Sequence, residues 1–184
     1  ASQLRTQNKA PWIDLEYGID SRRAYGCRLP SGREIALFFY DGAISSAVAF
    51  ERLLQNGENF ARILLSRFDR EGDTGQLMHL ATDGETYGHH HAHGDMALAY
   101  ALHYIEQNRL ARLTNYGEHL TLYPPTQEVR IKERTAWSCA HGVGRWTTNC
   151  GCNSGGHPIW NQNWRQPLRD ALDWLRDDLA QPYE

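Results

Sequence analysis

The sequence lacks the features that would direct it to a membrane or to nucleic acid. No apolar run approaches the roughly 20 residues needed to cross a bilayer, and no secretory-signal pattern opens the chain. The net charge is only -3, and the 19 basic residues are scattered among 22 acidic ones, so no basic stripe suits a phosphate backbone. We expect a soluble, cytoplasmic protein with no nucleic-acid or membrane partner.

The chain also lacks internal repeats, low-complexity tracts and an initiator Met. Its 184 residues suffice for one domain with a sizeable core, whereas a complete (β/α) barrel usually needs about 250 residues. The first ten residues are polar without periodicity, and the last helical pattern stops before residues 181–184. We therefore expect a part of a larger protein, with the remainder of the parent polypeptide as its partner.

Apolar patterns predict an α/β fold in which strands and helices alternate. A nearly continuous apolar run at 34–41 and a short apolar run within 76–82 predict two strands. Helical spacing predicts helices at about 45–55, 60–68, 96–107 (capped by Asp95), 112–122 and, as an amphipathic helix, 167–179. Alternation of this kind implies a parallel sheet, so Asp41 and Asp83, which follow the two strands, should point to one rim.

An acidic, histidine-rich loop follows the second predicted strand. It contains two carboxylates and several imidazoles, with glycines that let the backbone turn: Asp83, Gly84, Glu85, Gly88, His89, His90, His91 and His93. Loops after the carboxyl ends of strands commonly hold the chemistry of α/β proteins. If Asp83 faces a cleft among hydrophobic neighbours, it can keep its proton near neutral pH and act as a general acid. A solvated Asp-Gly turn is the alternative, and the packed imidazoles favour function.

Residues 83–89, Asp-Gly-Glu-Thr-Tyr-Gly-His, resemble the segment of glycoside hydrolase family 57 in which the Asp is the general acid/base. Residues 29–33, 38–45 and 137–142 are also similar to this family and occur in the same order. The similarity runs from about Trp12 to Leu179. It is to the branch whose catalytic barrel is followed by a helical domain of unassigned role.

The resemblance implies an incomplete (β/α) barrel of seven strands, a fold related to that of polysaccharide deacetylases, which acts on α-glucans with retention of configuration. Retaining enzymes use two carboxyl groups about 5 to 5.5 Å apart, one as nucleophile and one as acid/base. Asp83 matches the acid/base, whereas neither the nucleophilic Glu nor the family's opening His-Gln motif has a match here. We expect residues 1–136 to be the later part of the barrel, 137–165 an irregular Cys-, Gly- and Trp-rich segment completing the site, and 166–184 the start of the helical region. The isolated chain should then be inactive.

The resemblance also suggests substrate-binding residues. It places Glu85 and His89 beside the acid/base, and Trp137 and His141 in a later sugar-contacting segment. Asp41, on the predicted rim, can accept hydrogen bonds from sugar hydroxyls. The alternatives are that Asp41 caps a helix, that Trp137 lies in the core and that His141 caps a turn.

Cysteine and histidine side chains gather in the irregular segment 137–165. Cys139, Cys150, Cys152 and His157, together with His141, offer five ligands, and a tetrahedral zinc ion needs four. These residues could bind zinc, and any such ion would be structural, because the reaction implied by the resemblance requires no cofactor. Free thiols are an equally open alternative, and a Cys150–Cys152 disulfide is less favoured because its ring would be strained.

Two other functions fit parts of the sequence. Histidines 89–93 with an Asp suit a metal-dependent polysaccharide deacetylase, in which such ligands hold a metal that activates water. A non-catalytic carbohydrate-binding module would need the aromatic residues but no acid/base.

Overall fold

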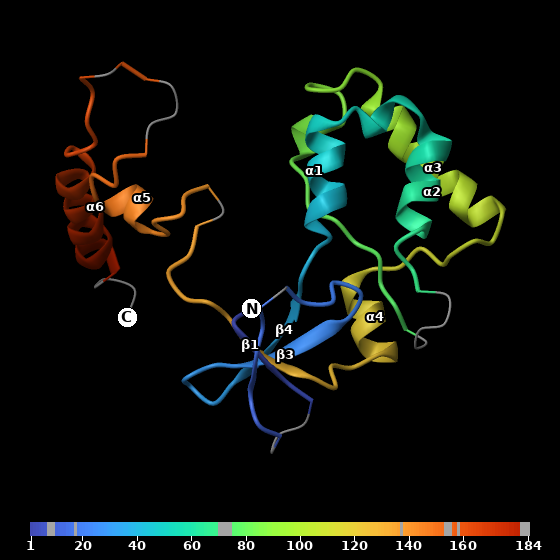
Figure 1. Ribbon diagram of the computed structural model, residues 1–184, viewed down its shortest axis with the longest axis horizontal. Helices are drawn as coiled ribbons and strands as arrows, with labels where there is room; N and C mark the ends of the chain where they lie inside the picture. The colour runs from blue at the N-terminus through green and yellow to red at the C-terminus, as the bar shows by residue number, and fades with distance from the viewer. Residues whose placement is uncertain are drawn as a thin grey trace. The chain divides into compact units, whose positions relative to one another are not determined.

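The computed structural model of the protein describes residues 1–6, 10–16, 18–69, 75–136, 138–152, 156–157 and 159–180. The chain divides into two units, Ala1–Ile131 and Lys132–Glu184. Figure 1 shows the sheet and most helices in the first unit and helices α5 and α6 in the second. Each unit is described by itself.

A five-stranded mixed sheet in the order β2-β1-β5-β3-β4 supports the first unit. The strands are β1 (Gln3–Arg5), β2 (Ile13–Asp14), β3 (Ala24–Arg28), β4 (Glu34–Phe38) and β5 (Glu128–Arg130). The β3–β4 hairpin has the longest ladder, and Gly32 in its turn has a φ of +81°, which glycine adopts without strain. Only β3 and β5 pair in parallel.

The structure confirms the strand predicted at 34–41, as β4, but residues 76–82 are not a strand. This second segment is held by single hydrogen bonds: Leu77 N donates to Arg22 O (2.8 Å), and Asp41 N donates to His79 O (3.2 Å). The predicted parallel sheet is therefore wrong for the described residues. The apolar run at 76–82 instead buries Met78 and Leu80 against helices.

The first unit's helices follow the predicted order. They are α1 (Gly42–Phe50), the 3-10 helix η1 (Leu53–Gln55), α2 (Gly57–Leu65), the 3-10 helix η2 (Gly84–Thr86), α3 (Gly94–Gln107) and α4 (Tyr116–Leu122). Asn56 caps α2 and Asn115 caps α4 with their side chains. The N-cap of α3 is His93 rather than the predicted Asp95, which lies in the first turn, where its charge favours the helix dipole.

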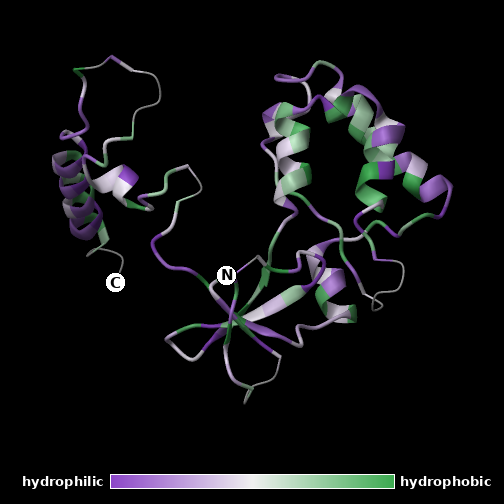
Figure 2. Cartoon of the chain, viewed as in Figure 1, coloured by the Kyte–Doolittle hydropathy of each residue, from purple (hydrophilic) through white to green (hydrophobic). Residues whose placement is uncertain are grey.

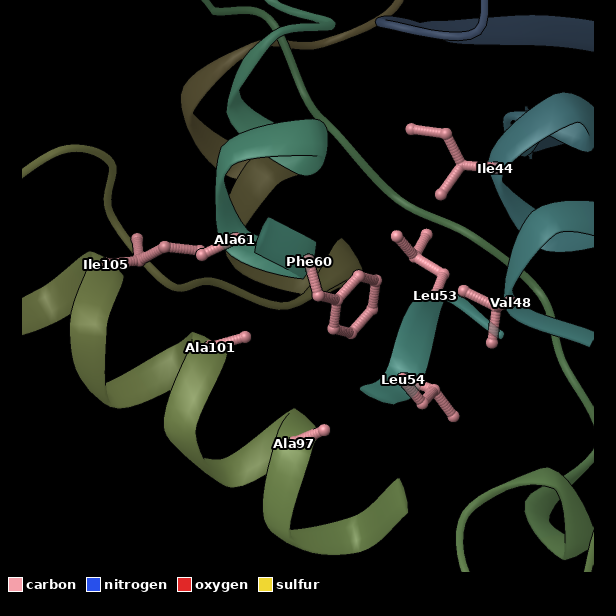
Figure 3. Packing of buried hydrophobic residues seen from close by; sticks show 9 residues of the cluster. All are labelled: Ile44, Val48, Leu53, Leu54, Phe60, Ala61, Ala97, Ala101 and Ile105. Carbon is pink, nitrogen blue, oxygen red and sulfur yellow. The ribbon is translucent and has the colours of Figure 1, made fainter. Parts of the chain in front are cut away.

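Helices α1, η1, α2 and α3 share one hydrophobic core (Figure 3). Phe60 of α2 is 1% exposed and lies beside Ala97 and Ala101 of α3. A Cβ on Gly57 would lie 2.8 Å from the Ala97 carbonyl oxygen, so glycine allows α2 and α3 to approach. This core positions the acidic loop, which lies in sequence between α2 and α3.

The second unit contains α5 (Gly144–Thr147) and α6 (Arg165–Ala180). Helix α6 confirms the amphipathic helix predicted at 167–179, and α5 is the only regular element among the described residues of 137–164. Figure 2 shows hydrophilic residues over much of α6. None of the described helices is both long enough and apolar enough to cross a membrane.

Candidate active site and metal centre

The acidic loop is anchored through its backbone and its buried residues. Thr86 is 4% exposed, and the Tyr87 hydroxyl lies 3.0 Å from Thr82 Oγ1. His91 Nε2 lies 3.0 Å from the carbonyl oxygen of Ala49 in α1 and, because that oxygen only accepts, Nε2 is the donor. These contacts fix the loop to the helical core while its tip faces solvent.

Asp83 lies at the exposed N-terminal end of η2, and its side chain makes no capping hydrogen bond there. Its carbonyl oxygen accepts from Thr86 N at 3.1 Å, so the backbone, not the carboxylate, closes the turn. The carboxylate is therefore accessible to a ligand. Asp83 is exposed in this structure.

The other polar residues of the loop interact mainly with one another. The Glu85 carboxylate is 3.3 Å from His90 Nε2, and both side chains are more than half exposed. The rings of His89 and His90 lie edge to face with centroids 5.0 Å apart. Glu85 and His89 are thus both reachable from solvent, as sugar-binding residues must be.

Asp41 has a structural role in this model. It is 8% exposed, accepts a hydrogen bond from Ile44 N (3.0 Å) as the N-cap of α1, and receives Arg67 Nε at 2.6 Å. The hydrogen bond from Arg67, with help from that of Ile44, lowers the pKa of Asp41 despite its burial. These contacts match the capping alternative from the sequence.

The segments that lead to Asp41 and Asp83 nevertheless run side by side. Besides the bond from Asp41 N to His79 O, Ala81 N donates to the hydroxyl of Ser45 in α1 (3.2 Å). The end of β4 and the residues before Asp83 therefore belong to one edge of the first unit, although no ladder joins them.

His79 positions the segment before Asp83, and sequence reasoning missed this role. Its Nε2 lies 3.1 Å from the carbonyl oxygen of Ser21 and its Nδ1 3.1 Å from the hydroxyl of Tyr116. The neutral ring with its proton on Nε2 satisfies both partners. Burial lowers the pKa of His79, which keeps it neutral. The available signal was a lone polar residue inside the apolar run 77–80.

In the second unit, four soft ligands converge. The ligand atoms of Cys139, His141, Cys150 and Cys152 all lie within 4.8 Å of one another. The structure thus brings together the three predicted cysteines, with His141 rather than His157 as the fourth member. His157 is exposed, and its ring lies 6.0 Å from that of Trp160. Trp137 lies outside the described residues.

Two glycines shape this cluster. Gly142 follows His141 with a φ of +59°, and a Cβ there would lie 2.1 Å from Arg134 O, so no other residue fits. The turn lets His141 N donate to Cys139 Sγ (3.4 Å) and Gly142 N to Cys139 O (3.0 Å). Gly151, with a φ of +77°, reverses the chain between Cys150 and Cys152. Both turns direct thiols toward a common point.

The packed thiols affect one another electrostatically. Hydrogen bonding to Cys139 raises the pKa of Cys152 to about 11, whereas the backbone bond from Cys152 lowers the pKa of Cys150. Three neighbouring thiolates repel one another unless a cation lies between them. Because its four ligand atoms lie within 4.8 Å of one another, the group could hold a metal ion such as zinc.

No other group of this kind is found in the part of the chain that the structure describes. Asp83 and the histidines of the acidic loop all belong to that part, and they do not converge as metal ligands.

Comparison with known proteins agrees with the resemblance seen in the sequence. A family model described as "Glycosyl hydrolase family 57" matches residues 15–132, which is more than half of the chain. A second model, described as "Domain of unknown function (DUF3536)", matches residues 160–184. No match was found among curated proteins or among solved structures.

Proposed function

Because the chain belongs to glycosyl hydrolase family 57, we propose that it forms part of a retaining hydrolase or transglycosidase in which Asp83 is the general acid/base. Membership places the chain among glycoside hydrolases and transglycosidases that act on α-glucans. The observation that carries the proposal is the match over residues 15–132, which includes the whole acidic loop. The accessible carboxylate of Asp83 supports the assignment.

For the fold, we propose that the first unit supplies βα units of the family's seven-stranded barrel. Residues 76–82 would occupy a strand position in that barrel, a proposal supported by their backbone hydrogen bonds to Arg22 and Asp41 and by the packing of Met78 and Leu80 against the helices. Residues 166–184 would begin the helical region, which agrees with the second family match at 160–184.

The proposed chemistry is a double displacement. Asp83 first donates its proton to the glycosidic oxygen while a carboxylate attacks the anomeric carbon, and it then removes a proton from water or from an acceptor sugar. We assign no nucleophile within this chain. Since Asp83 is exposed here, the water-poor surroundings that favour a protonated acid would come from the bound glucan and from the remainder of the parent polypeptide.

Supporting roles follow from accessibility. Glu85 and His89 are exposed beside Asp83 and are proposed to bind sugar hydroxyls. The Asp41 carboxylate already accepts hydrogen bonds from Ile44 and Arg67. We therefore propose that Asp41 holds α1 in place rather than contacts a sugar. His141 is assigned to the cysteine cluster, and Trp137 stays a hypothesis from the sequence alone.

The test uses the protein that contains this chain together with the family's nucleophile. Asp83→Ala should lower kcat on an unactivated α-glucan by roughly 10²–10⁴-fold, the usual contribution of a general acid. Formation of the glycosyl-enzyme from α-glucosyl fluoride should be much less affected, because fluoride leaves without a proton. Asp95→Asn, which changes an exposed carboxylate in the first turn of α3, is the matched control and should leave both rates unchanged. Wild-type turnover of the glucan by Asp83→Ala would refute the assignment.

A further inference from the structure

We propose that Cys139, His141, Cys150 and Cys152 bind one Zn²⁺ ion in a closed, structural site that organises the second unit. This proposal does not rest on the proposed role of Asp83. Three observations support the proposal: the distances between the ligand atoms, the groups around them, and the scarcity of buried apolar side chains among the described residues of this unit.

The distances suit a tetrahedral ion. Zinc–sulfur bonds near 2.3 Å and zinc–nitrogen bonds near 2.0 Å place tetrahedral ligand atoms about 3.5 to 3.8 Å apart. Cys139 Sγ lies 3.5 Å from His141 Nδ1, 3.5 Å from Cys152 Sγ and 4.0 Å from Cys150 Sγ. Cys152 Sγ lies 3.3 Å from His141 Nδ1. Four of the six pairs of ligand atoms thus lie within a few tenths of an ångström of the tetrahedral distances, and the other two pairs lie within 4.8 Å.

The same distances argue against a disulfide. A sulfur–sulfur bond is about 2.05 Å long, and a disulfide would use two thiols while leaving the third thiol and the imidazole with no common partner. All four cysteines of the chain are free thiols in the structure. Three thiolates and an imidazole are soft or borderline ligands, which favour zinc over magnesium or calcium. With four protein ligands no position is left for water or substrate, as in structural rather than catalytic zinc sites.

The surroundings complement the charge of such a centre. Zinc with three thiolates and a neutral imidazole carries a net charge of about -1. Arg165 Nη1 lies 3.5 Å from Cys150 Sγ and also donates to Gln162 Oε1 at 3.0 Å. Gln162 Nε2 in turn donates to the carbonyl oxygen of Cys152. Arg165 is the first residue of α6, so these contacts join the cluster to that helix.

The second unit has little else to hold it together. Among its described residues, the only buried hydrophobic one is Cys139, and neither α5 nor α6 contains a buried residue. Small units without a sufficient core usually depend on a metal ion or disulfides. The zinc ion would supply the central contact that apolar packing does not.

The test measures the metal directly. The full chain, purified without added metal, should contain about one zinc per chain by mass spectrometry. Its cobalt-exchanged form should show the intense visible bands of a tetrahedral ion and a thiolate-to-cobalt charge-transfer band. Cys150→Ser should lower both signals, whereas Cys27→Ser, which removes the buried thiol of the first unit, should leave them unchanged. His141→Ala and His157→Ala form a second pair with the same expectation.

If Cys150→Ser fails to fold, the wild-type chain still decides the question. Removal of zinc by a chelator should increase amide hydrogen exchange in α5 and α6 and leave α1 to α3 protected, and added zinc should reverse the change. Three results would each overturn the proposal. The first is a zinc content near zero while α6 stays fully protected from exchange, and the second is an equal zinc content in Cys150→Ser and Cys27→Ser. The third is a count of fewer than four free thiols after denaturation with chelator. None of these results depends on glucan turnover.

Discussion

Replacement of Asp41 separates a structural role from a substrate-binding one. Its side chain makes two contacts, the cap to Ile44 N and the ion pair with Arg67. Loss of an N-cap costs about 1 kcal/mol. The ion pair adds only about 0.5 to 1 kcal/mol, because the Arg67 side chain is 43% exposed and water replaces its partner. Asp41→Ala should therefore destabilise the first unit by about 2 kcal/mol.

Asn is as good an N-cap as Asp, so Asp41→Asn should lose only the ion pair and match Arg67→Gln at about 0.5 to 1 kcal/mol. The double variant should be no less stable than either single one. Because the pKa of Asp41 is lowered in the folded protein, the ion-pair contribution is complete above the unfolded value of 3.8. It is lost as the pH falls through the lower folded value. The gap between wild type and Asp41→Asn should thus close in acid.

Amide hydrogen exchange of α1 to α3 is the suitable assay. Trp12 is the only one of the six tryptophans that precedes Lys132, so intrinsic fluorescence reports mainly on the second unit. If Asp41→Asn and Asp41→Ala destabilised the first unit equally, the N-cap and the ion pair would not make the separate contributions given above. A raised KM for glucan with unchanged exchange in Asp41→Asn would contradict the structural role.

Four further changes have defined outcomes. Phe60→Ala should destabilise α1 to α3 by about 3 to 5 kcal/mol, since Phe60 is 1% exposed. A decrease in unfolding free energy of less than about 1 kcal/mol, measured by hydrogen exchange, would contradict the packing. Gly57→Ala should also loosen α2 from α3, because its Cβ would meet the Ala97 carbonyl, and unchanged exchange in α2 would count against it. Gly142→Ala should lower the unfolding free energy of the second unit by more than about 1 kcal/mol. Tryptophan fluorescence in denaturant measures this change, and an unchanged unfolding midpoint would contradict the tight turn at Gly142. Burial lowers the pKa of His79 in the folded protein, so the first unit should become less stable as the pH falls below 6.5 and the unfolded chain takes up a proton. His79→Gln should make the stability of the first unit less dependent on pH.

The sequence predicts most helices here but not the sheet pairing. Helical spacing located α2, α3 and α6 within a few residues, because each has enough periodic apolar positions for the pattern to be distinct. The run at 76–82 predicts a strand because a short apolar segment has the same sequence pattern whether or not neighbouring strands complete its ladder. Pairing of distant segments such as β3 with β5 leaves no local pattern.

The candidate sites show the same limit. All four residues of the metal group are among the five ligands that the sequence offers. The resemblance also suggests His141 for sugar binding, however, and spacing alone does not distinguish His141 from His157. The turn through Gly142 decides the matter, since it directs the His141 ring to Cys139. The ion pair of Asp41 with Arg67 joins residues 26 positions apart and is invisible to any local pattern. The exposure of Asp83 depends on tertiary packing, which the motif at 83–89 does not encode.

Rescue of Asp83→Ala by azide tests the central claim most directly. In a retaining enzyme without its acid/base, an activated α-glucosyl donor still forms the glycosyl-enzyme, and azide, which needs no base, attacks it. The account predicts faster turnover with azide and an α-glucosyl azide product of retained configuration. Absence of rescue, or a β-glucosyl azide of the kind expected when the nucleophile is missing, would contradict the assignment of Asp83.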